Sequence, residues 1–167
     1  SLVGSRELKG EARAFARRAG EEMARQGYTL VSGGARGTDR EGQEACLAAG
    51  GRVIAVLAAP QGAPPVPNLL LCWEDSFDLP FSPARALSRN RIIHILGEKT
   101  LVAQTSPGFG GTWNGTEENL RRGWSPVFFF DDGSPGAQAL IERGATAVGM
   151  SQLKHLSALF PAQTTFF

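Results

Sequence analysis

Three short stretches of the sequence combine glycine with arginine or with small polar residues. They read VGSR at residues 3–6, SGGARGTD at residues 32–39 and GGTWNGTEE at residues 110–118. Glycines let backbone N–H groups approach an anion closely, and Arg, Ser and Thr side chains donate hydrogen bonds suited to phosphate oxygens. The same glycines also fit tight turns that bind nothing, so each stretch alone is compatible with a phosphate site or with a simple turn.

Two common phosphate-binding motifs do not occur in the chain. The pattern GxxxxGK[ST] of P-loop nucleotidases is absent, and so is the dinucleotide fingerprint GxGxxG. The sequence therefore argues against a P-loop NTPase and against an ordinary nicotinamide-dependent dehydrogenase.

A fourth stretch, SRNRIIHILGEK at residues 88–99, places arginines near the predicted start of a helix. Arg85, Arg89 and Arg91 lie there together with Asn90. A helix start favours anions, so cations at this position indicate an external anionic ligand. The alternative is a solvated helical face with ion pairs to nearby acidic residues, namely Glu74, Asp75 or Asp78.

The third glycine stretch also carries carboxylates and an aromatic side chain. Glu117 and Glu118 are predicted in the first turn of a helix, where the helix dipole alone explains carboxylates. The alternative makes one of them a sugar-hydroxyl ligand or a catalytic carboxylate, although no acid–base partner is evident. Trp113 is predicted in an exposed loop, where it either stacks on a base or covers the edge of the core. Trp73 and Phe77 leave the same choice open, with core packing favoured.

The histidines and cysteines do not indicate a metal site. His94 lies among isoleucines and is predicted to be a partly buried, hydrogen-bonded side chain, and His155 lies in a predicted terminal helix. Cys46 and Cys72 lie in apolar surroundings and are expected to be free thiols in a reducing, cytoplasmic compartment. The sequence predicts no cofactor.

Alternating strand and helix patterns place these residues in an α/β fold. Strands are predicted at 2–3, 28–32, 52–58, 100–104 and 125–130, and the type of segment 69–73 is left open. Helices are predicted from about 12 to 27, from a capping box at Thr38 and Glu41 to about 50, from Ser82-Pro83 to Gly97, after the turn at 107–116, at 137–145 and at 151–159. This order is typical of a Rossmann-like, mainly parallel sheet with helices on both faces. Ligands bind such sheets beyond the carboxyl ends of the strands.

Length and composition fit a single domain. The chain has 167 residues, 42% hydrophobic and 20% charged, with a net charge of +1. This balance gives no global field for nucleic acid, so any such site depends on local clustering. No apolar stretch is long enough to span a membrane. We expect one domain over residues 1–167, cut from a longer protein or lacking a preceding segment.

Several of these stretches together resemble the DNA-processing protein A (DprA, or Smf) family. The matching segments are VGSR, LVSGGARGTD, AAGGRVIAVLA, RNRII, LVAQ and ALIERGA, in this order over about residues 2–148. The resemblance implies a Rossmann-like core that binds single-stranded DNA, forms a homodimer and helps to load the RecA recombinase in natural transformation, without a known catalytic reaction. It also implies a phosphate-binding or DNA-binding pocket formed by Gly4, Ser5, Arg6, Ser32, Gly33, Gly34, Arg36, Gly37, Arg89, Asn90, Arg91, Gly110, Gly111 and Thr112.

The chain departs from the family pattern at three places. Gln43 stands where the family usually has a histidine. AAPQGAPPVPN stands where the family has a loop with a Gly-rich turn and a Tyr-Pro pair. GGTWNGT stands where the family has SGSLITA, and it looks like the PGGxGTxxE loop of LOG-type nucleotide phosphoribohydrolases. The family's flanking helical and winged-helix domains are not among these residues.

The sequence therefore leaves two functions open. The first is non-enzymatic binding of single-stranded DNA. The second is a sensor or phosphoribohydrolase-like enzyme for a nucleoside monophosphate, with Glu117 or Glu118 near the ribose.

Overall fold

The computed structural model describes residues 1–60, 65–74 and 79–161. The strands are β1 (Leu2–Val3), β2 (Thr29–Ser32), β3 (Arg52–Leu57), β4 (Leu69–Trp73), β5 (Thr100–Val102), β6 (Val127–Phe130) and β7 (Thr146–Val148). The helices are α1 (Ala12–Arg25), α2 (Thr38–Ala48), α3 (Pro83–Leu96), α4 (Gly110–Arg122), α5 (Pro135–Glu142) and the 3₁₀ helix η1 (Met150–Ala158).

All strand pairs are parallel. One ladder runs β1-β5-β6-β7 and the other runs β2-β3-β4. The two ladders meet at β1 and β2, where the Ser32 hydroxyl donates to the Leu2 carbonyl at 2.9 Å. From β1 the chain adds β2, β3 and β4 on one side of the sheet. Helix α3 then returns the chain to β5, which lies on the other side of β1. The strand order reverses between β1 and β5, which makes this the switch point where such sheets bind ligands.

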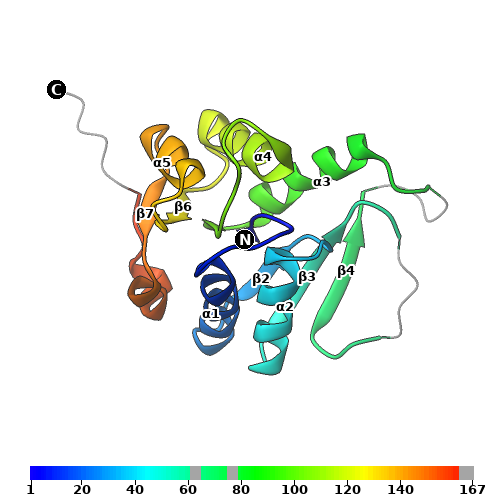
Figure 1. Ribbon diagram of the computed structural model, residues 1–167. Coiled ribbons are helices and arrows are strands. Elements are labelled where there is room, and N and C mark those ends of the chain that lie inside the picture. Colours follow the sequence, from blue (N-terminus) through cyan, green and yellow to red (C-terminus); the bar gives the residue numbers. More distant parts are fainter. Residues whose placement is uncertain (61–64, 75–78, 162–167) are drawn as a thin grey trace.

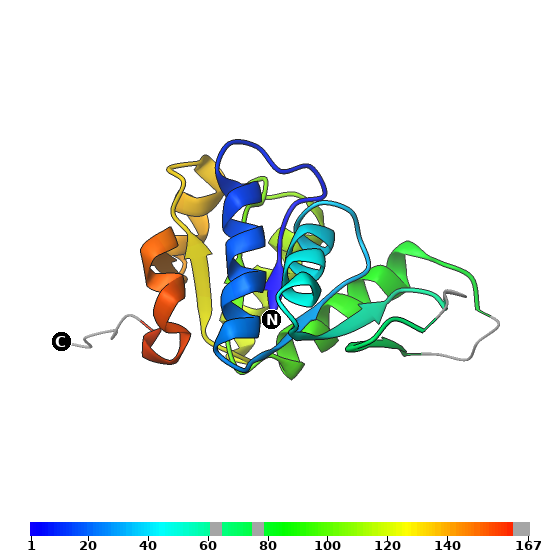
Figure 2. The same ribbon diagram turned by 90° about the horizontal axis from the view of Figure 1, so that it is seen from below.

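Helices cover both faces of the sheet, as Figures 1 and 2 show. Helices α1, α2 and η1 lie on one face, and α3, α4 and α5 lie on the other. This confirms the predicted Rossmann-like α/β class. Among the described residues no helix has both the length and the apolarity needed to cross a membrane.

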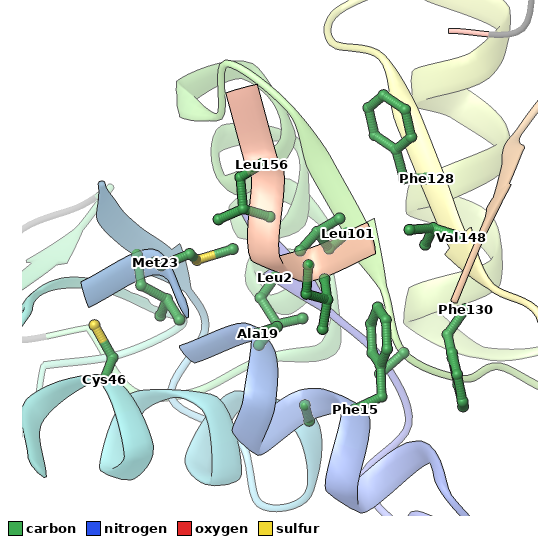
Figure 3. Packing of buried hydrophobic residues seen from close by; sticks show 14 of the residues in the cluster. Leu2, Phe15, Ala19, Met23, Cys46, Leu101, Phe128, Phe130, Val148 and Leu156 are labelled. Carbon is green, nitrogen blue, oxygen red and sulfur yellow. The ribbon is translucent and has the colours of Figure 1, made fainter. Parts of the chain in front are cut away.

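Side-chain alternation along each strand produces the two cores. Leu2, Leu101 and Phe128 pack against α1 and η1, whereas the next residues, Val3, Val102 and Phe129, pack on the opposite face. On the α1 side the ring of Phe15 stacks on Phe130 with the ring centroids 4.4 Å apart (Figure 3). Because both faces are covered, the strands consist of nearly continuous apolar residues.

Several local predictions are wrong, each for a local reason. Thr38 and Glu41 form no capping box: Gly37 is the N-cap of α2, the Thr38 hydroxyl donates to the Ser5 carbonyl, and Glu41 pairs with Arg13 and Arg17. The predicted turn at 107–116 is largely helical, because α4 begins at Gly110 despite its glycines.

Other elements were missed or left open in the sequence. Segment 69–73 is the strand β4, and 146–148 is the short strand β7, which the pattern did not reveal. The last helix is a 3₁₀ helix. Ser82 caps α3 as predicted, since its hydroxyl accepts from the Arg85 amide at 3.2 Å. Cys46 and Cys72 are free thiols, although only Cys46 is fully buried. Phe77, Asp75 and Asp78 lie outside the described residues.

Candidate anion-binding site

A cleft of about 790 Å³ opens at the switch point, beyond the carboxyl ends of β1 and β5. We call it the switch-point cleft. The segments after β1 and β5 and the facing parts of α3 and α4 line it, and the predicted residues that it contains are Gly4, Ser5, Arg6, Arg89, Asn90, Gly110, Gly111 and Thr112.

Hydrogen bonds tie the segments around the cleft together. The Ser5 amide donates to the Gln104 carbonyl at 2.8 Å, joining the segments after β1 and β5. The Thr38 amide donates to the Ser5 carbonyl at 3.1 Å, which adds the start of α2. The Thr112 hydroxyl donates to the Gly4 carbonyl at 2.9 Å, which fixes the start of α4. The sequence motifs are therefore brought into one place by backbone contacts.

Arg89 forms the floor of the cleft. Its side chain is 7% exposed, and one terminal nitrogen donates to the Val56 carbonyl at 2.8 Å. Its Nε finds no hydrogen-bond partner among the described residues. A buried donor without a partner carries a desolvation cost.

Asp39 lies beside this guanidinium and also lines the cleft. Burial raises the pKa of its carboxyl group, and the nearby Arg89 acts in the opposite direction. Burial likewise lowers the pKa of the Arg89 guanidinium, and Asp39 opposes that shift. The opposite charges of Arg89 and Asp39 therefore offset each other. The net positive charge that faces a ligand comes mainly from the exposed Arg6.

The helix α4 directs its N-terminus at the same cleft. Phe109 is its N-cap, and no side-chain hydrogen bond from the described residues caps the helix. Gly110, Gly111 and Thr112 form its first turn and line the cleft. Backbone N–H groups in a first helical turn favour anions, and the helix dipole adds to this preference.

The remaining predicted residues stand around the cleft rather than in its lining. Gly33 is buried behind it: a Cβ at this position would lie 2.0 Å from a terminal nitrogen of Arg89. Gly33 therefore makes room for the guanidinium.

Ser32 is fully buried and its hydroxyl donates to the Leu2 carbonyl. Gly37 has a positive φ of 79°, and a Cβ there would lie 2.4 Å from the Ser5 carbonyl oxygen. Gly34 is exposed beside Leu57.

Arg36 and Arg91 are exposed cations with acidic partners. Arg36 pairs with Glu7 at 3.0 Å, and Arg91 pairs with Glu118 at 3.0 Å. Exposed pairs of this kind contribute little, so a phosphate can compete for either arginine. Arg85 lies in the first turn of α3, but Arg89 and Arg91 lie in its middle, so the prediction that these two stand near a helix start is wrong.

Neither Glu117 nor Glu118 belongs to the described lining of the cleft. Both lie in the middle of α4, where Glu117 pairs with Arg143 at 3.3 Å and Glu118 also pairs with Arg122 at 3.0 Å. Their catalytic role stays a prediction. Trp113 is 5% exposed and packs in the core, so the expected exposed loop position is wrong and the core alternative is confirmed.

Sequence reasoning did not assign Asp39, Phe81, Phe109 or His94 to the site, yet all four line the cleft. Asp39 lies in the GARGTD stretch, so its motif was available as a signal. Phe81 and Phe109 had no signal beyond their position just before predicted helices. No cluster of three or more metal-binding side chains occurs in the described parts of the chain.

The sheet order, the glycine-lined edge and the arginines define a class: a Rossmann-like α/β protein with a ligand cleft at the switch point. Within that class, the chain belongs to the family of DNA recombination-mediator protein A, whose model matches residues 1–159. The family resemblance predicted from the motifs is thereby confirmed.

Solved structures show the same fold. DNA processing protein A (DprA) from Streptococcus pneumoniae is 24% identical with a TM-score of 0.79, covering 96% of this chain and 61% of that one. DNA processing protein A from Helicobacter pylori is 22% identical with a TM-score of 0.72, covering 92% of this chain and 75% of that one. The molybdenum cofactor binding protein from Rippkaea orientalis is 15% identical with a TM-score of 0.69, covering 88% of this chain and 86% of that one. No curated protein matches the sequence.

Proposed function

We propose that this protein binds single-stranded DNA, with the DNA phosphates in the switch-point cleft. The observation that carries the proposal is a single cleft that brings together exposed Arg6, the buried Arg89 and the uncapped start of α4. The family membership supports it, and the Helicobacter pylori relative is described by its single-stranded DNA binding mode.

Each group in the cleft would make a different contact with the DNA. Arg6 is exposed, so it would contact a phosphate by charge-assisted hydrogen bonds. The first-turn amides of α4 would bind a second oxygen, and Asn90 and Ser5 would orient the strand. Contacts to phosphates carry no sequence information, so binding through them would show no sequence preference.

The family resemblance extends the proposal to the whole protein's biology. It suggests a recombination mediator in natural transformation that acts in the cytoplasm as a homodimer together with RecA. The chain spans 61% of the Streptococcus pneumoniae structure, so these properties are proposals for the protein as a whole.

The size of the cleft favours one second candidate. A volume of about 790 Å³ lies within the range of small-molecule sites, so a nucleoside monophosphate would fit. Glu117 and Glu118 stand outside the described lining, so this candidate is a nucleotide sensor more readily than a phosphoribohydrolase.

The decisive variant is Arg6→Ala, measured by fluorescence anisotropy with a labelled oligo(dT) of about 15 nucleotides, near the upper site size of single-strand binders. Affinity should fall, and the slope of log K against log salt should decrease by about 0.7, because one phosphate contact is lost. Arg121→Ala is the matched control: it also removes one exposed cation, but in the last turn of α4, away from the cleft.

Two results would contradict the proposal. If the unmodified protein shows no salt-sensitive binding to oligo(dT), it is not a single-strand binder of this kind. If Arg6→Ala and Arg121→Ala weaken binding equally, the cleft is not the site.

A further inference from the structure

Phe109 is exposed beyond what its structural position requires. It is 77% exposed at the mouth of the switch-point cleft, as the N-cap of α4. Helices prefer Ser, Thr, Asp or Asn at this position, because those side chains accept a hydrogen bond from the first turn. Phenylalanine supplies no such bond, and a ring this exposed contributes little to the core.

A second ring stands on the same cleft. Phe81 is 56% exposed and lines the cleft from the segment that precedes α3. The mouth thus combines aromatic rings with the cationic Arg6 and the start of α4. A free phosphate or sulfate makes no favourable contact with exposed aromatic rings. A nucleotide with an unpaired base can stack its base on a ring and bind its phosphate at the cationic groups.

We infer that Phe109 is a base-stacking platform for an unpaired nucleobase whose neighbouring phosphate lies against the start of α4. This inference rests on the proposed function and adds to it the recognition of bases. Trp113, for which the sequence left a stacking role open, is buried and unavailable, whereas Phe109 in the segment between β5 and α4 is exposed.

Stacking on a ring face tolerates every base but requires the base to be unpaired. Duplex DNA keeps its bases stacked inside the helix, so the ring would select single strands. Phosphate contacts alone do not make this distinction. The aromatic mouth therefore supplies the preference for single-stranded over duplex DNA that Arg6 and Arg89 lack.

The test compares two ligands of equal length and charge: an oligo(dT) and an abasic oligonucleotide that keeps the sugar-phosphate chain without bases. Phe109→Leu should weaken oligo(dT) binding about 10-fold, the loss of one stacked base, and leave abasic binding unchanged. Phe109→Trp should retain oligo(dT) binding. An oligonucleotide with 2-aminopurine should lose its stacking-dependent quenching in Phe109→Leu only.

Phe160→Leu is the matched control, because Phe160 is also exposed, at 73%, but lies beside Lys99 just before the start of β5. Equal losses for both ligands in Phe109→Leu, or no loss for either, would overturn the stacking role while leaving phosphate binding intact. If the unmodified protein binds neither ligand, the proposed function fails together with the inference.

Discussion

His94 is a buried imidazole whose neutral form the fold requires. It is 1% exposed, and its Nδ1 lies 3.1 Å from the Asn119 amide nitrogen, which donates to it. Thr100 and Ser125 complete this buried polar cluster. The sequence-based prediction of a hydrogen-bonded structural histidine agrees with this environment. It also gives the protein a measurable dependence on pH.

Burial lowers the pKa of His94 from 6.5 to about 4. Between these pH values the unfolded chain binds a proton that the folded protein does not, so the free energy of unfolding falls as the pH falls. The loss should reach about 3 kcal/mol between pH 6.5 and pH 4. Denaturant unfolding at a series of pH values measures this change. The unmodified protein should show this loss of stability between pH 6.5 and pH 4, and His94→Gln should lack it. The same slope in both proteins would contradict the assignment.

The position of the Arg89 side chain depends on the absence of a side chain at Gly33. The glycine has no side chain, and the guanidinium occupies the space that a Cβ would fill. The sequence identified both residues as phosphate ligands. In the structure Gly33 makes room for Arg89, whose side chain is buried at the floor of the cleft.

At the scale of elements, α3 is the helix that carries Arg89 and Asn90 into the cleft. Its start is fixed by the Ser82 cap and by Pro83 at the first helical position. These signals are local, which is why the sequence predicted them correctly.

Ser82→Ala should lower the free energy of unfolding by about 1 kcal/mol, because the Arg85 amide loses its acceptor. Ser106→Ala provides the comparison, since Ser106 is exposed in the segment after β5 and caps no helix in the described structure. Urea unfolding measures both. Equal stability of the two variants would show that the cap does not stabilise α3.

The helix α4 illustrates the opposite case. Glycines at 108, 110 and 111 indicate a turn by propensity, yet the chain is helical from Gly110. Burial of Trp113 and the Thr112 bond to the Gly4 carbonyl stabilise this start through tertiary contacts. Propensity is a weak prior that such contacts override.

At the scale of the whole molecule, charge is nearly balanced, with 17 Lys and Arg against 16 Asp and Glu. Most exposed arginines are paired with carboxylates, as at Arg36 and Arg91. Binding of an anionic polymer must therefore arise at a local site, and only a few phosphates should be neutralised.

A thermal-shift comparison separates the two proposed ligands. Oligo(dT) at a hundredfold excess over its dissociation constant should stabilise the fold by about 2.7 kcal/mol, whereas thymidine monophosphate at the same concentration should give a much smaller shift. The polymer gains from several contacts and the monomer from one. Equal stabilisation by both would favour the nucleotide sensor.

The sequence by itself determined the fold class and the motifs of the site. Apolar strands without alternation, amphipathic helices and the joint pattern of GARGTD and RNRII are local or ordered along the chain, so they are readable in one dimension. The cap at Ser82 belongs to the same group.

Only the tertiary structure decided how each motif residue is used. Whether Trp113 faces solvent or the core, whether Arg89 is free or buried, and which ring stands at the mouth all depend on packing between segments far apart in the chain. The strand β7 was missed because three residues carry too little pattern without their partner β6. Hydrogen bonds such as Thr112 to Gly4 and Ser5 to Gln104 join segments about a hundred residues apart, and no local propensity encodes such contacts.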